Sequence, residues 1–215
     1  DQDALSVASW GCPFHPKFKA RYFDLLRTFC KYPAITRIAL NDEAFLMSGC
    51  YCAYCREAYR SEIGGEMPCK PEPCAADWED PVWREFLHWR ILRWNRVHGE
   101  MADVIHGENP SVKAVFLTSP CVELWLNPWR TGVDLSTMIE QIDGISVDPY
   151  YTFHPRHFDP AEAYLSEWCR LLACIVPEGK DAEIVPQGFS HPTFTRPLDE
   201  GDGYWAALIP PACGI

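Results

Sequence analysis

The chain has 215 residues, of which 47% are hydrophobic and 13% aromatic, so it has enough apolar material for a large single core. Its formal charge is -11 and its basic residues are scattered singly, so we expect no nucleic-acid partner, because phosphate binding needs clustered Lys and Arg. No apolar run reaches about eighteen residues and no basic and apolar leader opens the chain, so we expect no membrane anchor.

The cysteine content bears on the redox compartment. Eleven cysteines are present, and three of them lie too close together in sequence for an ordinary disulfide framework. Part of the set is better explained as thiolate ligands or as buried apolar residues. This usage favours a reducing compartment, and we expect a cytoplasmic protein. The lack of an initiator Met and the ending at Cys213-Gly214-Ile215 indicate a piece of a longer chain.

Hydrophobic periodicity predicts alternating helices and strands. In chain order we expect a helix over 16–31, a strand over 34–40, a short helix after Cys55, a long helix from Pro81, a strand over 113–118, a helical stretch over 134–142, a strand over 144–147, a helix over 160–176, a strand over 182–185 and a helical stretch over 199–210. This alternation is typical of βα units around a parallel sheet, so the predicted fold class is α/β.

Breaker residues set several of the boundaries. Pro33 ends the first helix, Gly64-Gly65 breaks the second, and Asp80-Pro81 opens the longest one. The segment 64–80 lies between the second helix and the longest one. It is rich in Pro and contains Cys, and we expect it to be an irregular insertion.

Polar and aromatic residues follow each predicted strand. In a parallel barrel the functional groups lie at the carboxyl ends of the strands, so these residues are candidates for a site. The candidates for binding substrate are Asn41, Asp42, Glu123, Trp125, Tyr150 and Gln187. Aromatic rings at such positions stack on the apolar faces of sugars, and together with carboxylates they point to carbohydrate.

Two carboxylates are candidates for catalysis. Glu43, flanked by Asp42 and apolar Ala44, follows the first strand, where a raised pKa would suit a general acid. A solvated acidic loop is the alternative, and the strand-end position favours the catalytic interpretation. Asp148 follows the third strand, and a turn-forming Asp before Pro149 explains it equally well.

A run of cysteines follows Glu43. Cys50, Cys52 and Cys55 supply three thiolates within one loop, and a tetrahedral structural zinc needs a fourth, for which Cys12 is the candidate. Three unliganded thiols in a tight turn are the alternative, which we rank lower because clustered exposed thiols are easily oxidised. Cys69 and Cys74 could instead provide a ligand or pair with each other. The cysteines expected to be plain core residues are Cys30, Cys121, Cys169, Cys174 and Cys213.

These features resemble a known family. Gly11-Cys12-Pro13, a helix, a strand ending in Asn-Asp-Glu, and then Cys-Tyr-Cys-x-x-Cys are similar to the core of the family-42 β-galactosidases and related clan-A glycoside hydrolases. The segment 142–150 resembles their sixth strand. The resemblance implies that 1–215 is a fragment of a single (β/α)8 TIM barrel, with strands four to seven and the start of strand eight.

The resemblance also implies a mechanism. Glu43 matches the general acid/base of a retaining glycosidase, and Cys12, Cys50, Cys52 and Cys55 match its zinc ligands. Two positions depart from the family. Asp42 stands where the family has Asn, which weakens galactoside specificity. Gln187 stands near the place of the nucleophile on the seventh strand, and an amide cannot act as a carboxylate nucleophile.

Three functions follow as hypotheses. The first is a glycoside hydrolase with a carbohydrate substrate, in which Asp148 or Glu123 replaces the missing nucleophile. The second is a catalytically inactive sugar-binding barrel, indicated by Gln187. The third is a zinc-organised interaction module without a pocket, ranked last because the βα alternation is regular. Homo-oligomerisation of the full-length protein is left open by the sequence.

Overall fold

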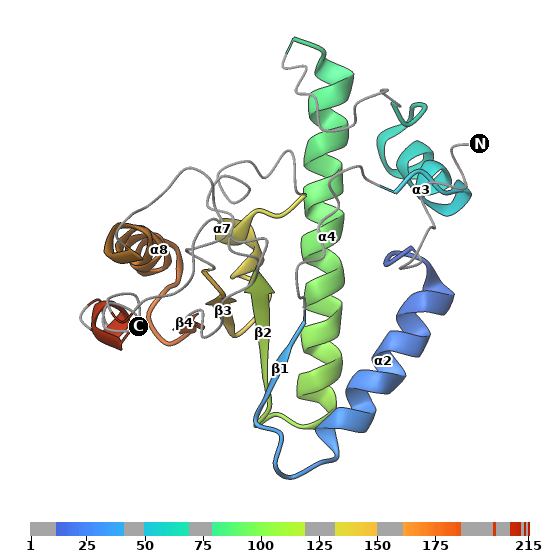
Figure 1. The fold of residues 1–215 in the computed structure, drawn as a ribbon. Coiled ribbons are helices and arrows are strands. Elements are labelled where there is room, and N and C mark those ends of the chain that lie inside the picture. Colours follow the sequence, from blue (N-terminus) through green and yellow to red (C-terminus); the bar gives the residue numbers. More distant parts are fainter. Residues whose placement is uncertain are drawn as a thin grey trace.

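The computed structural model describes residues 12–40, 50–68, 79–118, 132–149, 161–185, 200, 207–211, 213 and 215. Its centre is a parallel sheet of four strands in the order in which they occur along the chain (Figure 1). The strands are β1 (Arg37–Ala39), β2 (Lys113–Thr118), β3 (Gly144–Val147) and β4 (Asp181–Ile184). Parallel neighbours need crossover connections, so helices come between the strands and all four carboxyl ends lie at one edge of the sheet.

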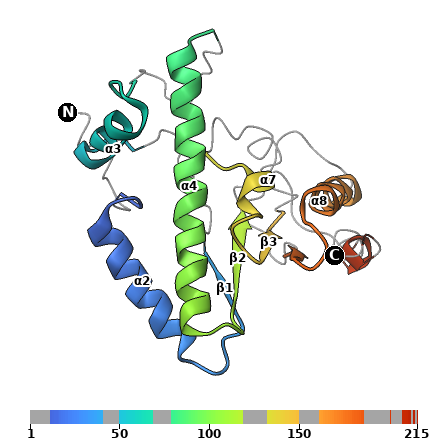
Figure 2. The same cartoon turned by 180° about the vertical axis from the view of Figure 1, so that it is seen from behind.

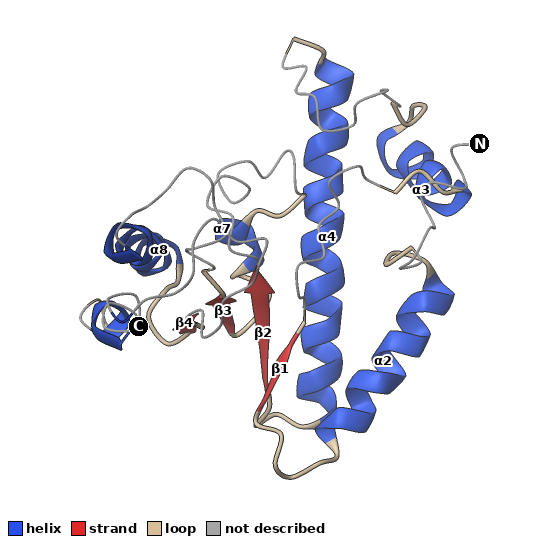
Figure 3. Ribbon diagram, in the orientation of Figure 1, coloured by secondary structure: helices blue, strands red, loops and turns tan. Residues whose placement is uncertain are grey.

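The helices are α2 (Pro16–Cys30), α3 (Ala53–Ile63), α4 (Pro81–Glu108), α7 (Leu135–Met138) and α8 (Ala161–Ile175). The long helix α4 packs on β2, and α2 packs on α4. Figures 1 and 2 agree that α4 separates α2 and α3 from the sheet. Colouring by secondary structure shows the strands gathered on one side of α4 (Figure 3). Among the described helices, none is both long and apolar enough to cross a bilayer.

Capping residues account for where the helices begin and end. Asp80 accepts hydrogen bonds from the N–H groups of Val82 and Trp83, and Pro81 takes the first helical position, as the sequence predicts for α4. At its carboxyl end, α3 stops at Gly64, whose φ of 94° lies in the left-handed region that favours glycine.

The predicted elements are confirmed, with shifts in their ends. β2 and β3 have the expected bounds, β1 is shorter than the expected strand over 34–40, and β4 begins one residue earlier than expected. Of the last helical stretch, residues 200 and 207–211 are described and helical. Most of the expected insertion over 64–80 lies outside the described residues.

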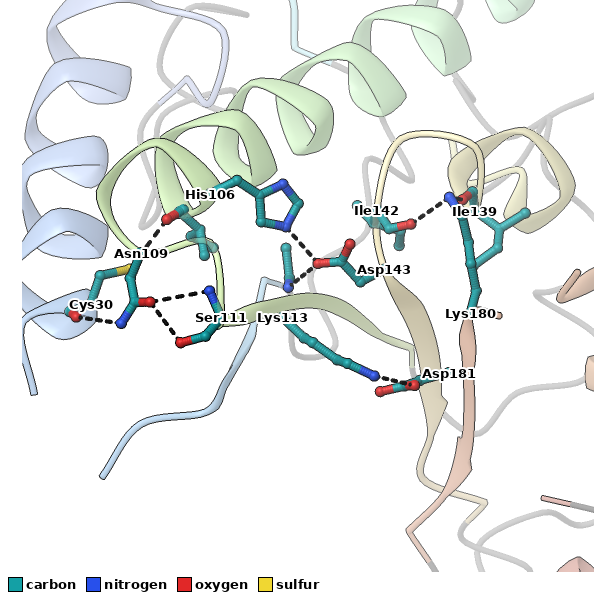
Figure 4. Close-up of polar contacts among 12 residues, drawn as sticks. Cys30, His106, Asn109, Ser111, Lys113, Ile139, Ile142, Asp143, Lys180 and Asp181 are labelled. Carbon is teal, nitrogen blue, oxygen red and sulfur yellow. Dashed lines mark hydrogen bonds and ion pairs between the residues drawn. The ribbon is translucent and has the colours of Figure 1, made fainter. Parts of the chain in front are cut away.

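The stretch over 134–142 is wrong in extent, because α7 covers only Leu135–Met138. The ammonium of Lys180, which precedes β4, donates to the carbonyls of Ile139 at 2.5 Å and Ile142 at 2.7 Å (Figure 4). The N–H of Asp143, which would continue the helix by donating to Ile139, donates instead to the carbonyl of Ala114 on β2 at 2.9 Å, and Lys180 satisfies the carbonyls left over.

Polar contacts join the amino ends of the strands (Figure 4). His106 near the end of α4 contacts the Asp143 carboxylate at 2.7 Å, and the N–H of Ala114 donates to the same oxygen at 2.7 Å. On β4, Asp181 pairs with Lys113 at 2.6 Å, which lowers the pKa of the Asp181 carboxyl. These contacts fix α4 against β2 and β3 at the end of the sheet opposite the predicted site.

Gly144 allows β3 and β4 to come close together. A Cβ at this position would lie 2.6 Å from both the Cβ and the carbonyl oxygen of Asp181. Real side chains do not approach so closely, so the position needs glycine for steric reasons.

Candidate metal centre and strand-end site

The four predicted thiol ligands come from two parts of the chain. Cys12 lies just before α2, and the other three surround the start of α3. Cys52 is the residue that precedes the first turn of α3, with extended backbone at φ -63° and ψ 162°, and Cys55 lies in that first turn. The extended link at Cys52 and the helical turn after it fold Cys50 back toward Cys55. A run of cysteines in sequence thus becomes a cluster in space.

The sulfurs are close enough to share one metal ion. All four Sγ atoms lie within 4.8 Å of one another, and those of Cys12 and Cys55 are 3.5 Å apart. Sulfurs at about 2.3 Å from a tetrahedral zinc are separated by about 3.8 Å, so small side-chain movements suffice to close the shell. Cys55 is fully buried and Cys50 is 6% exposed, which limits access of water to the cluster.

Hydrogen bonds within the cluster distribute its charge. Hydrogen bonds from the thiols of Cys12 and Cys55 lower the pKa of Cys50. The same contact with Cys50 raises the pKa of Cys12 to about 12, and the contact with Cys12 raises that of Cys55. A divalent metal must displace the protons held on these thiols, so metal binding releases protons.

The donor set fits a soft or borderline metal. Thiolate ligands favour Zn²⁺, Cu⁺ or an iron–sulfur cluster over Mg²⁺ or Ca²⁺. Four thiolates fill a tetrahedral zinc shell and leave no position for water, so such a site is structural rather than catalytic. The cluster therefore suits a metal that holds the start of α3 to the segment before α2.

Arg93 on α4 contacts residues of the two segments that carry the four cysteines. Its guanidinium lies 5.0 Å from the ring centre of Phe14 and 4.9 Å from that of Trp89, and it donates to the Glu62 carboxylate at 2.6 Å. The Trp89 indole N–H donates to the other oxygen of Glu62 at 2.8 Å. The segment after Cys12, helix α3 and helix α4 thus meet at one side chain.

Sequence reasoning missed Arg93. A signal was present, because Arg93 follows Trp89 by four residues and so lies on the same face of the long helix as a large aromatic residue. Arg93 is only 9% exposed, and a buried guanidinium needs a charged partner, which Glu62 on α3 supplies.

Among the predicted strand-end residues, the structure describes Asp148. It follows β3 directly, is 5% exposed, and its N–H donates to the carbonyl of Thr118 at the end of β2 at 3.4 Å. The predicted residues outside the described part of the chain are Asn41, Asp42, Glu43, Glu123, Trp125, Tyr150 and Gln187. Glu43 lies four residues beyond the last residue of β1, and its catalytic role stays a prediction.

A cleft of about 450 Å³ lies elsewhere, at the exposed side of β4. Arg37, Asp181 and Glu183 line it, and Arg37 forms ion pairs with both carboxylates. The cleft runs along all of β4 and does not include Asp148, the described residue of the predicted site. The paired charges in it explain local packing of the sheet and do not match the predicted carbohydrate site.

The remaining cysteines divide into buried and exposed ones. Cys30 and Cys169 are buried, which confirms the prediction of core residues. That prediction is wrong for Cys174 and Cys213, which are exposed. On α8 the fully buried face runs through Leu165, Trp168, Cys169 and Leu172, and Cys174 lies off that face. Cys69, Cys74 and Cys121 lie outside the described residues.

No protein-family profile and no curated protein matches the sequence. Solved structures do match. A cold-adapted β-galactosidase from Rahnella sp. R3 superposes with a TM-score of 0.63 at 17% identity over 88% of this chain and 31% of that one. The PgaB (BpsB) glycoside hydrolase domain from Bordetella bronchiseptica superposes with a TM-score of 0.67 at 14% identity. The match covers 95% of this chain and 56% of that one. A β-galactosidase from the psychrophilic Marinomonas ef1 superposes with a TM-score of 0.59 at 10% identity. The match covers 91% of this chain and 35% of that one.

These similarities establish the fold. The parallel sheet with its crossover helices forms part of a TIM barrel, as the sequence predicts. The chain spans between about a third and just over half of the solved chains it matches.

Proposed function

We propose that the chain is part of a carbohydrate-active TIM barrel, a retaining glycoside hydrolase with Glu43 as its general acid/base. The observation that supports this most is the parallel sheet, which brings the ends of β1, β2 and β3 to one edge. Glu43 follows the first of these strands and Asp148 the third. The folds shared with two β-galactosidases and a glycoside hydrolase domain add to this support.

Strand spacing allows the two carboxyl groups to work together. β1 and β3 flank β2, so their ends lie about 10 Å apart at the backbone. A Glu and an Asp side chain that lean toward each other can narrow this gap to the about 5 Å of a retaining pair. In this mechanism Glu43 protonates the leaving oxygen, and Asp148 forms the glycosyl-enzyme bond that water then cleaves with help from Glu43.

We assign the four cysteines to a structural zinc site. Cys12, Cys50, Cys52 and Cys55 would hold the ion, which would restrain the start of α3. Glu43 lies in the sequence between β1 and α3. The metal would not activate water, so the acid chemistry belongs to the carboxylates alone.

The experiment compares the full-length protein with its Glu43→Gln variant on a panel of aryl glycosides. Loss of the general acid should lower turnover by at least about 100-fold, because proton transfer contributes that much to such reactions. Glu57→Gln on the exposed face of α3 is the matched control and should retain full turnover. Equal turnover by wild type and Glu43→Gln would reject the proposed role.

Gln187 favours a second function, a sugar-binding barrel without hydrolysis. Its amide lies in sequence near the end of β4, at the place where the resembling family carries its nucleophile. Sugar binding by calorimetry, with no turnover in either protein and equal affinity in Glu43→Gln, would establish this function instead. The cytoplasmic location and the oligomeric state stay predictions.

A further inference from the structure

The four-cysteine cluster contains a Cys-x-x-Cys pair at the amino end of α3. Cys52 is the residue that precedes the first turn of this helix, and Cys55 lies within that turn. Their sulfur atoms are among the four that lie within 4.8 Å of one another. Side chains at these two positions of a helix start face each other, so the two thiols stay neighbours with or without a metal.

Exposure distinguishes the two thiols. Cys52 is partly exposed, whereas Cys55 is 0% exposed. Cys12 and Cys50 are also buried, at 9% and 6% exposed, so Cys52 is the member of the cluster that a solute reaches most easily. Zinc holds its cysteines as thiolates, and the thiolate is the form that attacks a disulfide. A zinc-bound Cys52 is therefore a nucleophile in contact with solvent.

We propose that Cys52 and Cys55 are a redox switch, which releases the metal when a low-molecular-weight disulfide such as glutathione disulfide oxidises them. This switch rests on the structural zinc proposed above. The Cys52 thiolate attacks one sulfur of glutathione disulfide, which forms a mixed disulfide and releases one glutathione thiolate. The Cys55 thiolate then attacks the Cys52 sulfur and displaces the second glutathione thiolate. Two protein thiolates are oxidised, one glutathione disulfide is reduced to two glutathione thiolates, and zinc leaves as Zn²⁺.

The chain geometry favours Cys55 over the other cysteines as the second partner. The sulfur of Cys12 lies 3.5 Å from that of Cys55, but the two residues are 43 positions apart in the sequence. Cys12 belongs to a separate segment, which can move away once the metal no longer ties it to α3. Closing a loop within one helical turn costs less entropy than closing that long one. Cys50 is separated from Cys52 by a single residue, and so short a loop is stiff.

Oxidation of this pair changes the metal site. Cys12 and Cys50 remain as thiolates, and two ligands do not fill the tetrahedral shell of a structural zinc. The affinity for zinc therefore falls, and the start of α3 loses its tie to the segment before α2. Zinc stays bound in a reducing compartment and leaves in an oxidising one.

Zinc release from the whole chain tests the switch. The zinc content is measured first, and the protein is then incubated with glutathione disulfide and a colorimetric zinc indicator. We expect release of about one zinc ion per chain, which dithiothreitol and added zinc reverse. A chain that binds no zinc at the start would overturn the zinc assignment and the switch together. A chain that keeps its zinc under glutathione disulfide would overturn the switch alone.

Peptide mapping identifies the partners. Trypsin places Cys12 in peptide 1–17 and the other three cysteines of the cluster in peptide 38–56. The oxidised protein is alkylated, digested and sequenced by mass spectrometry without reduction. We expect an internal disulfide between Cys52 and Cys55, with the remaining cysteine of that peptide alkylated. A cross-link between the two peptides, or glutathione remaining on Cys52 of the folded protein, would overturn the proposal.

Two matched variants separate Cys52 from another ligand of the cluster. Histidine replaces one cysteine in many structural zinc sites, so both Cys52→His and Cys12→His should load zinc. Cys52→His has no thiol at the accessible position and should release zinc at least about tenfold more slowly than wild type. Cys12→His keeps the reactive pair and should release zinc at least as fast as wild type. Protection by Cys12→His and none by Cys52→His would contradict the switch. If a variant fails to load zinc, the disulfide mapped in the wild type decides.

Discussion

At the scale of single residues, burial changes the free energy of ionising a side chain, and His98 is the clearest case. It lies in the middle of α4, 1% exposed, with its ring 4.6 Å from Trp94 and 5.0 Å from Phe116. Its Nδ1 contacts the carbonyl of Trp94 at 2.8 Å, so this nitrogen carries the proton of the neutral ring. Burial lowers the pKa of His98 to about 4.

This shift predicts a pH-dependent stability. Between the unfolded pKa of 6.5 and the folded pKa of about 4, the unfolded chain binds one more proton, so the free energy of unfolding falls as pH falls. The loss from this residue is about 3 kcal/mol over that window, at 1.36 kcal/mol per pKa unit. Urea unfolding of wild type and His98→Gln at pH 7 and pH 4 measures it. The variant should lose less stability on acidification, and His88→Gln, exposed on the same helix, should behave as wild type.

An identical acid-induced loss in His98→Gln would show that His98 does not set the slope. His98→Phe provides a second test in which the ring contacts are retained. It too should lose less stability than wild type on acidification.

At the scale of elements, Arg93 joins α3 and α4 to the segment before α2. The side chain of Arg93 is 10% exposed, and its guanidinium pairs with Glu62, whose side chain is 38% exposed. Replacing one partner of a largely buried pair leaves the other charge poorly compensated. The two ring contacts of Arg93 add to what is lost.

We therefore predict that Arg93→Met lowers the free energy of unfolding by about 2 kcal/mol, discounted for the exposure of Glu62. It should also weaken zinc affinity in a chelator competition, because the segment that carries Cys12 loses its contact with α3. Arg60→Met is the matched control: Arg60 forms exposed pairs with Glu57 and Glu66 on α3 and should change neither measurement. Unaltered zinc affinity and stability in Arg93→Met would refute this role.

Local sequence signals specified most elements. Asp80 and Pro81 mark the start of α4, and the apolar runs of β2 and β3 give their bounds without error. α7 could not be bounded in this way, because the partners of the backbone groups at its end, Ala114 and Lys180, lie about thirty and forty positions away in the sequence. The same holds for the site. The cysteine spacing predicts the cluster from local sequence, whereas the burial of Arg93 depends on packing between segments distant in the sequence.

At the scale of the whole molecule, metal binding and folding are coupled. The four sulfurs hold together two parts of the chain about forty residues apart, so a bound ion would stabilise the folded state relative to the unfolded one. We predict one zinc ion per chain by elemental analysis and a fall in Tm on treatment with a chelator. Cys12→Ser should lose the zinc, whereas Cys174→Ser should retain it. A metal-free protein with the same Tm would contradict the site.

The proposed hydrolase depends most on where the Glu43 carboxyl group lies relative to its partner. A crystal structure of the full-length protein with a bound sugar would give that distance directly. The account predicts a separation of about 5 Å between the carboxyl groups of Glu43 and Asp148, on opposite sides of the scissile bond. A structure in which no carboxylate lies within about 9.5 Å of Glu43 would contradict it.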